Sequence, residues 1–322
     1  MHLRSMALAA LTLLGTIATA SAADTHLDLI VFQGINNLPL LAAQQEGFFA
    51  RRGISISVKI TGGSDELRTG LAEGRYQLAV AAVDNAVAMA EVAKVDIAIV
   101  TGGDNSFNHL FVQPDIASLA DLRGKTVIVD AVNTAYAFQL YEILKRSGLN
   151  PGDYAVKPLG ATNRRVAAME SEKDDKATML NPPFTLRAAQ AGLKDMGSAV
   201  KILGPYQASG VTVLRSWAAA NSATLVSFLQ AYIEGLRWAL DPAHKDATIK
   251  LLAEGLDLPP DIAAATYAIA VDPGEGLAKD AKFDMVGFKN LLKLRTDWTG
   301  KAPGPPEKYV DLSYYEKALA GL

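Results

Sequence analysis

The sequence predicts an α/β protein with two lobes joined by a hinge and a helical C-terminal part. Strands and helices alternate from residue 27 to 101, the alternation restarts near residue 118, and the chain from residue 222 onward has helical periodicity alone. Alternating strands and helices predict a parallel sheet covered by helices on both faces. We expect one lobe from residues 23–110 and 210–322 and a second lobe from residues 111–209.

The elements of the first lobe follow from apolar runs and helix-ending residues. Pro39 suits the first turn of a helix, where its missing N–H has no partner to lose, and Gly53 suits a left-handed helix end. The predicted strands are Leu27–Phe32, Ile54–Ile60, Leu78–Ala82 and Ile97–Thr101. The predicted helices are Pro39–Arg52, Ser64–Glu73 with Ser64 as its N-cap, and Asn85–Ala93.

The second lobe repeats this order of elements. Its predicted strands are Thr126–Asp130, Tyr154–Pro158, Ala177–Leu180 and Val200–Leu203. Its predicted helices are Thr134–Ser147, Arg164–Glu170 and Pro182–Ala191. Two chain crossings, Asn108–Gln113 and Tyr206–Arg215, are expected to form the hinge.

The last third of the chain is predicted to be helical. Apolar residues recur at helical spacing from Leu225 to Leu240, and Asp241-Pro242 then breaks that helix. Further helices are predicted at Thr248–Ala253, Pro260–Ala270, Phe283–Thr296 and Ser313–Ala320. We expect Trp217, Trp238 and Trp298 to be packing residues rather than a stacking platform for a ligand.

The N-terminus has the pattern of a secretory signal peptide, which we expect to span residues 1–22. Arg4 supplies the positive charge, Leu8–Ala18 the apolar stretch and Ala20-Ser21-Ala22 the cleavage site. The chain has no cysteine, so we expect neither lipid anchoring through cysteine nor disulfides, and a location in the bacterial periplasm. The formal net charge is −3 with acidic and basic residues interspersed, which argues against nucleic acid as a partner.

Polar residues follow nearly every predicted strand of both lobes. Ligands of open α/β sheets bind outside the carboxyl ends of the strands, and two facing lobes place both sets of ends on one cleft. The candidate ligand-binding residues are Gln33, Asn36, Asn37, Gly63, Ser64, Asp84, Asn85, Asn105, Asn108, Asn133, Thr134, Asn163 and Asn181. Each of them taken singly is also explained as an ordinary helix cap.

The charge of the ligand is left open by these residues. Helix N-termini carry partial positive charge and favour an anion. Asp84 argues the other way, because it would repel an anion or accept a bond from an amine or a pyrimidine N–H. Arg164 and Arg165, in the first turn of a helix, have three open roles: binding a ligand carboxylate, contacting the other lobe, or forming a solvated surface pair.

Sequence patterns of enzymes are missing. His26, His109 and His244 are far apart in the chain and have no metal-ligand spacing, and a packing role in the hinge is expected for His109. The chain has neither a G-x-S-x-G motif nor a thiol nucleophile, and no G-K-[ST] follows Gly102-Gly103. We therefore expect a binding protein without catalysis, metal or cofactor.

One segment has a family pattern. Leu38 to Ile54 contains P-x-x-x-A-x-x-x-G-F-F-x-x-x-G-I, and with the segment Leu119–Val127 it resembles periplasmic solute-binding proteins of ABC importers. The similar branch serves sulfonates, taurine, nitrate and thiamine-precursor pyrimidines.

The resemblance implies a type II periplasmic-binding-protein clamshell that captures a small molecule between its lobes. It also implies delivery to an inner-membrane ABC permease, and we expect a monomer. We expect the ligand to be a sulfonate-like or other organic anion in the first place, and a neutral pyrimidine-like heterocycle in the second. A two-lobe sensor that presents its ligand to a membrane kinase is the alternative function.

Overall fold

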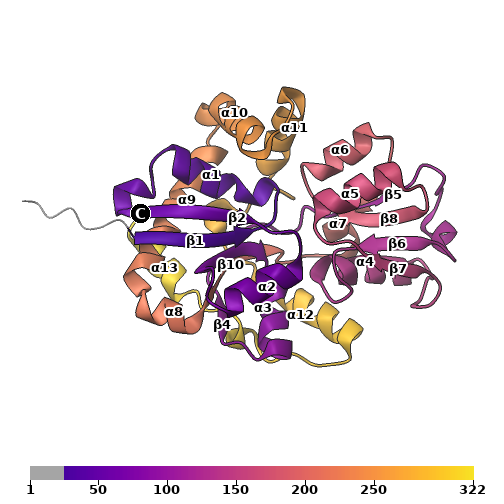
Figure 1. Cartoon of the computed structure of the whole chain (residues 1–322), viewed down its shortest axis with the longest axis horizontal. Helices are drawn as coiled ribbons and strands as arrows, with labels where there is room; N and C mark the ends of the chain where they lie inside the picture. The colour runs from indigo at the N-terminus through magenta and orange to yellow at the C-terminus, as the bar shows by residue number, and fades with distance from the viewer. Residues whose placement is uncertain (1–24) are drawn as a thin grey trace, which may run out of the picture.

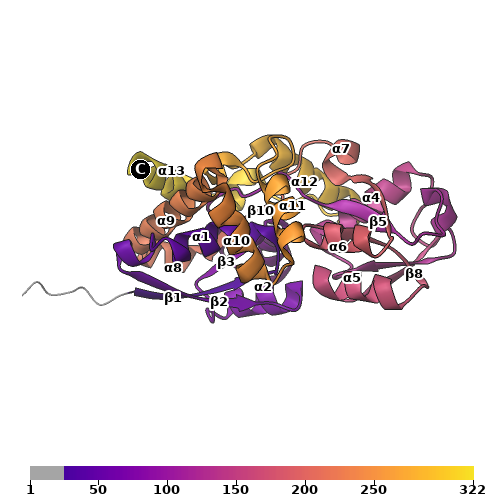
Figure 2. The same cartoon turned by 90° about the horizontal axis from the view of Figure 1, so that it is seen from above.

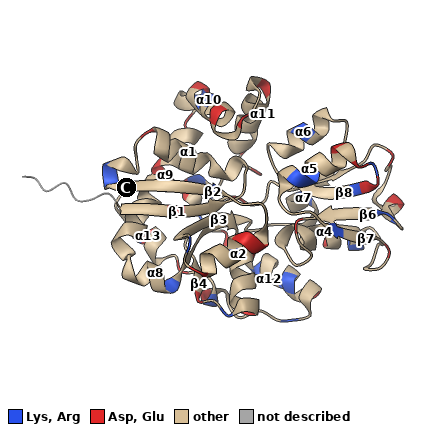
Figure 3. Cartoon of the chain, viewed as in Figure 1, with Lys and Arg blue, Asp and Glu red and all other residues tan. Residues whose placement is uncertain are grey.

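A computed structural model describes residues 25–322, and two α/β lobes lie side by side in it (Figure 1). The expected signal peptide lies outside the described residues. Within residues 25–322, no helix is both long and apolar enough to cross a bilayer. Figure 3 shows charges of both signs distributed over both lobes.

Lobe 1 is built on a five-stranded sheet with the order β2-β1-β3-β10-β4. Its strands are β1 (Thr25–Val31), β2 (Ile54–Ile60), β3 (Leu78–Ala82), β4 (Ile97–Ile99) and β10 (Ser209–Leu214). β1 pairs in parallel with β2 and β3, whereas β10 runs antiparallel to β3 and β4. The predicted sheet is therefore confirmed, but it is mixed rather than parallel, because the returning chain inserts as β10.

Lobe 2 repeats this topology with the order β7-β6-β8-β5-β9. Its strands are β5 (His109–Val112), β6 (Thr126–Val129), β7 (Ala155–Pro158), β8 (Asp175–Leu180) and β9 (Lys194–Ser198). β5 runs antiparallel to β8 and β9. The segments predicted to be hinge crossings thus become the antiparallel strands of the two sheets, and the chain passes between lobes just before each of them.

Helices cover both faces of each sheet. In lobe 1 they are α1 (Leu38–Gln45), α2 (Ser64–Ala72), α3 (Asp84–Ala88), α8 (Arg215–Ala220), α9 (Ser222–Leu240), α10 (Lys245–Leu256), α11 (Pro260–Ala270), α12 (Met285–Thr299) and α13 (Ser313–Ala320). In lobe 2 they are α4 (Ala135–Arg146), α5 (Thr162–Ser171), α6 (Phe184–Gln190) and α7 (Ala199–Leu203). The α/β two-lobe class is confirmed.

The cores follow from these layers. Apolar residues of α1, α9 and α10 pack on one face of the lobe 1 sheet, and those of α2, α3 and α12 pack on the other. α4 and α7 cover one face of the lobe 2 sheet, and α5 and α6 cover the other. Trp217 and Trp238 lie against the lobe 1 core and Trp298 against the lobe 2 core, as expected for packing residues. In Figure 2, α12 extends from lobe 1 toward α4 of lobe 2.

Some of the predicted elements are wrong in extent or type. The helix predicted for Pro39–Arg52 ends at Gln45, because Gly47 adopts φ 68° and the Phe48 N–H donates back to the Ala43 carbonyl. The last strand of lobe 2 is not Val200–Leu203, which forms α7. Lys194–Ser198 takes the strand position instead, at the sheet edge, where a polar sequence is tolerated.

Two predictions of helix starts have different outcomes. Thr134, predicted as the first residue of a helix, caps α4 by accepting the N–H of Ala137 at 3.4 Å. Ser64 does not cap α2, because Gly63 occupies the N-cap position and the Ser64 hydroxyl donates to Asp130 of lobe 2 at 3.1 Å. The helix predicted for Asn85–Ala93 begins one residue earlier and changes to a π-helical turn at Met89–Ala93.

Candidate functional site

A small cavity of about 50 Å³ lies between the lobes, where the carboxyl ends of strands from both sheets meet. Lobe 1 lines it with Phe32, Gln33, Asn36, Ser64, Val80, Ala81, Ala82 and Asn85. Lobe 2 lines it with Asp130, Thr134, Ala135, Tyr136, Ala161, Thr162, Arg165 and Asn181. A second hollow of about 20 Å³ shares Asn36, Ala82, Tyr136 and Asn181 with it and extends toward the hinge. We refer to the two together as the interlobe cavity.

The interlobe cavity brings together part of the predicted ligand-binding set. The predicted residues that line it are Gln33, Asn36, Ser64, Asn85, Asn108, Thr134 and Asn181. The Oδ1 atom of Asn36 is buried there with no hydrogen-bond partner among the described residues. A buried amide oxygen without a partner costs free energy, so Asn36 is suited to accept a bond from a ligand. Whether these residues bind a ligand stays a prediction.

The other predicted residues lie elsewhere. Asn37 donates to the Phe32 carbonyl at 2.8 Å and lines a separate hollow beside α1 and α10. Gly63 caps α2, Asn133 is exposed, and Asn163 accepts the N–H of Arg164 at 2.9 Å. Asp84 is buried against Arg295, with 2.6 Å between its Oδ1 atom and the guanidinium Nη1. It therefore does not face the cavity, although its neighbour Asn85 does.

Arg165 is the most unusual group of the cavity lining. It is 1% exposed, and its guanidinium donates to the Gly160 carbonyl and to the Thr178 and Thr162 hydroxyls at 2.8–3.0 Å, and also to the Met179 carbonyl. All four partners are neutral, and no carboxylate lies within ion-pair distance of it among residues 25–322. Burial lowers the pKa of Arg165, and nearby Asp130 and Tyr136 oppose that shift. Since arginine stays protonated in proteins, this is a buried positive charge without a bonded counterion.

Asp130 is the carboxylate whose charge acts on Arg165, but both of its oxygens already accept hydrogen bonds from other residues. Oδ2 accepts the Ser64 hydroxyl of lobe 1 at 3.1 Å, and Oδ1 accepts the Thr134 hydroxyl. The Ser64–Asp130 bond therefore connects the two walls of the cavity. Tyr136 adds an aromatic surface, with the Arg165 guanidinium carbon 5.4 Å from its ring centroid. Burial, followed by the charge of Asp104, raises the pKa of Tyr136, so this phenol stays protonated.

Sequence patterns do not identify Phe32, Asp130, Tyr136 and Thr162 as cavity residues, and they leave the role of Arg165 open. A signal exists for Asp130, because it directly follows the buried strand Thr126–Val129, as the predicted residues follow theirs. Tyr136 lies in the first turn of α4, just after the segment that follows the same strand, but an aromatic residue there is equally typical of the core. Arg165 has no local signal, since its burial depends on packing against β8.

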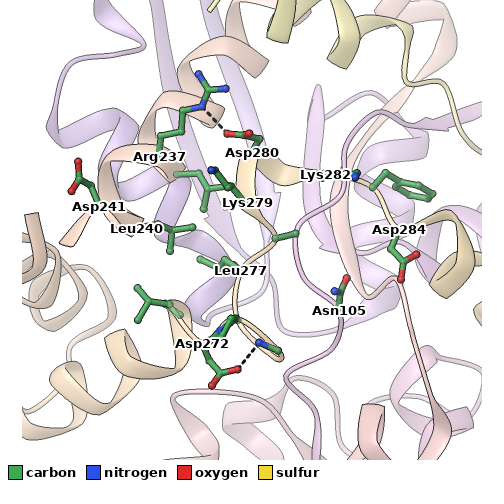
Figure 4. A pocket seen from close by; sticks show the side chains of 18 residues that line it. Asn105, Arg237, Leu240, Asp241, Asp272, Leu277, Lys279, Asp280, Lys282 and Asp284 are labelled. Carbon is green, nitrogen blue, oxygen red and sulfur yellow. Dashed lines mark hydrogen bonds and ion pairs between the residues drawn. The ribbon is translucent and has the colours of Figure 1, made fainter. Parts of the chain in front are cut away.

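A much larger hollow, of about 1100 Å³, is a separate groove on lobe 1 (Figure 4). It is lined by residues from α9 and from the segment that follows α11, and Asn105 of the predicted set belongs to it. Two of its charged groups bond to each other, since Arg237 donates to Asp280 at 2.7 Å, and the Asp272 carboxylate accepts the Gly274 backbone N–H at 2.8 Å. Because this groove lies away from the strand ends and involves lobe 1 alone, we favour the interlobe cavity as the functional site.

A cluster of charged residues joins the lobes beside the hinge. His109 of β5 contacts Asp195 of β9 at 2.7 Å and Glu275 of lobe 1 at 3.4 Å. Lys201 of α7 also reaches Glu275, at 2.6 Å. Burial lowers the pKa of His109, but the hydrogen bonds and charges of Asp195 and Glu275 outweigh it, and the net direction is upward from 6.5. The expected packing role of His109 is thus a polar contact between lobes.

We expect this contact to weaken as the pH rises. A raised pKa in the folded protein means that the charged imidazole stabilises it below pH 6.5 and that the contribution disappears as the pH passes the raised value. His109→Gln should therefore lower the free energy of unfolding by about 1 kcal/mol at pH 6 and by much less at pH 8.5. Thermal unfolding of both proteins across this range measures the difference, and a difference independent of pH would contradict the expectation.

Comparison with solved structures finds the same fold. A protein of Bordetella bronchiseptica RB50 is 20% identical, with 92% of this chain and 97% of that chain covered and a TM-score of 0.78. The periplasmic nitrate-binding protein NrtA of Synechocystis PCC 6803 is 13% identical, with 92% and 89% covered and a TM-score of 0.76. The periplasmic aliphatic sulphonate-binding protein SsuA of Escherichia coli is 16% identical, with 90% and 99% covered and a TM-score of 0.70.

These similarities establish the periplasmic-binding-protein fold and leave the ligand of this chain open. The fold also occurs in an enzyme, since the desulfurization enzyme DSZB is similar at 15% identity and a TM-score of 0.65. No curated protein matches the sequence. The model of the family described as NMT1/THI5 like matches residues 35–245, which is more than half of the sequence. The chain is therefore a member of the NMT1/THI5-like family, with the two-lobe fold of nitrate- and sulfonate-binding proteins of ABC importers.

Proposed function

We propose that this protein is the periplasmic solute-binding component of an ABC importer. It captures a small organic anion in the interlobe cavity and delivers it to an inner-membrane permease. The family and the fold support the role of a binding protein. The N-terminal signal pattern supports export, and the lack of cysteine supports a protein that is not lipidated.

The buried guanidinium of Arg165 is the observation that supports an anion as the ligand. A cation at 1% exposure with neutral partners alone is stabilised when an anionic group enters beside it. Its four hydrogen bonds leave one guanidinium N–H free, since arginine carries five. The cavity walls supply amide groups from Asn85 and Asn181 for the rest of the solute.

A neutral nitrogen heterocycle is the second candidate. Phe32 and Tyr136 give the cavity aromatic walls from opposite lobes, and side-chain amides and hydroxyls stand between them. Such a site can hold a flat ring by its faces and bond its nitrogen atoms at the edge. In this case the Asp130 carboxylate would accept an N–H of the ring, and the Arg165 charge would contribute less to affinity.

Thermal unfolding of the mature protein tests the proposal. The screen uses nitrate, methanesulfonate, benzoate and 2-methylpyrimidin-4-amine, each over a range of concentrations. A solute present at a hundredfold excess over its Kd stabilises the folded state by about 2.7 kcal/mol, which corresponds to a rise in Tm of roughly 4–8 °C. A rise with one of the anions supports the first candidate, and a rise with the pyrimidine alone supports the second. No rise with any solute class would count against the receptor function.

A further inference from the structure

Helix α12 connects the two lobes behind the interlobe cavity. Its residues Phe288 and Leu291 belong to the core of lobe 1, Trp298 packs against the core of lobe 2, and Leu294 packs against both. The Trp298 ring lies 5.3 Å from the ring of Tyr141, which belongs to α4. Residues of one helix therefore pack into both lobes, and α12 lies beside α4 in Figure 2.

Arg295 of the same helix contacts residues of both lobes, and two of them adjoin the cavity lining in sequence. Its Nη1 atom lies 2.6 Å from Asp84 Oδ1 and donates also to the Asn133 carbonyl at 3.5 Å. Its guanidinium carbon lies 5.2 Å from the ring centroid of Phe138 in α4. Both ends of the ion pair are buried, with side chains 7% and 3% exposed.

The partners of Arg295 precede residues of the cavity lining. Asp84 is followed by Asn85, which lines the cavity from lobe 1. Asn133 is followed by Thr134, which lines it from lobe 2 and caps α4. A single guanidinium thus holds the starts of α3 and α4 at a fixed separation. Because a buried charge is costly to leave unpaired, this arrangement resists displacement of either helix.

We propose that Arg295 is a positioning residue. It holds the two cavity walls at a fixed separation and thereby sets solute affinity without touching the solute. The inference rests on the proposed binding function for its effect on affinity. Its structural part, the control of the lobe separation, is independent of any solute. The two parts therefore need separate measurements.

The lobe separation can be measured directly because the chain has no cysteine of its own. Ala72→Cys and Lys173→Cys place one spin label on each lobe at exposed positions. We expect Arg295→Gln to broaden the distribution of distances between the labels toward longer values, in the absence of solute. Arg295→Lys keeps a charge for Asp84 but cannot reach all three partners, so it should produce a smaller change.

Arg52→Gln is the matched control. Arg52 forms an ion pair with Glu234 at 2.6 Å, but both residues belong to lobe 1. We expect Arg52→Gln to lower the Tm without changing the distance distribution. If Arg295→Gln gives the same distribution as Arg52→Gln, the proposal is overturned. Should Arg295→Gln not fold, Arg295→Lys and Phe138→Leu provide the same comparison.

Affinity is measured with methanesulfonate as the probe. Arg295→Gln, which removes the contacts of Arg295 with both lobes, should weaken methanesulfonate binding by roughly two- to thirtyfold. Arg52→Gln should leave the affinity for methanesulfonate unchanged. Unchanged methanesulfonate affinity in a folded Arg295→Gln protein would also overturn the proposal. If the unsubstituted protein does not bind methanesulfonate, the anion of the thermal screen that it does bind replaces it as the probe. If it binds none of the anions, the proposed anion function is what fails, and the label distances still decide the role of Arg295.

Discussion

Arg165→Gln is expected to lose roughly 10- to 150-fold in affinity for an anionic solute, the factor that corresponds to a charge-assisted hydrogen bond of about 1.5–3 kcal/mol. Glutamine retains donor capacity but carries no charge, so the attraction to an anion disappears. The Gly160 and Met179 carbonyls also lose their donor. We therefore expect a lower free energy of unfolding as well, by about 1–3 kcal/mol. Calorimetric titration and thermal unfolding measure the two effects separately.

A surface arginine of the same lobe controls for this substitution. Arg187 of α6 pairs with Glu170, and its side chain is 48% exposed. Arg187→Gln should leave both affinity and stability nearly unchanged, because exposed ion pairs contribute little. If Arg165→Gln folds and binds the anion as tightly as the Arg187 variant does, Arg165 is not the anion-binding group. A neutral heterocycle would then become the better candidate.

The fold is predictable to the extent that it depends on local patterns. The apolar run Leu78–Ala82 coincides with β3, because a buried central strand leaves a continuous apolar signal. Ile54–Ile60 coincides with the edge strand β2, where apolar and polar residues alternate. The edge strand Lys194–Ser198 has a polar sequence, so the apolar segment after it gives the stronger strand signal although it folds as α7. The segments predicted to cross between the lobes form β5 and β10 instead, because their antiparallel pairing depends on contacts with distant strands.

The residues that line the cavity can be predicted from the sequence only where the position of a residue after its strand decides whether its side chain faces the cavity. Asn85 and Asp84 are neighbours after the same strand, yet Asn85 lines the cavity and Asp84 is paired with Arg295 of α12. Nothing near residue 84 indicates a partner so distant in sequence. Arg165 shows the same limitation, because the acceptors that bury it come from β8 and the loop before α5. Sequence identifies the edge of the sheet, and tertiary packing selects the residues that face the cavity.

The approach of the two lobes depends on glycine at the mouth of the cavity. Gly160 of lobe 2 adopts φ +83°, and a Cβ atom there would lie 2.6 Å from the Gly62 carbonyl oxygen of lobe 1. The adjacent Ala161 N–H donates to the same oxygen at 3.1 Å. A side chain at this position therefore meets backbone of the opposite lobe, which has no flexible end that could move aside.

Gly160→Ala is accordingly expected to keep the lobes apart and to weaken solute binding by roughly 5- to 150-fold, since a methyl group at 2.6 Å corresponds to an overpacking cost of about 1–3 kcal/mol. Gly148→Ala separates this effect from backbone strain: Gly148 has φ +84° in the same lobe, but no atom lies within 4 Å of the position that a Cβ atom would take there. Both variants should lose about 1–2 kcal/mol of folding stability from the left-handed alanine. Affinity should fall in Gly160→Ala alone, and an equal fall in both would mean that the contact between Gly62 and Gly160 does not govern closure.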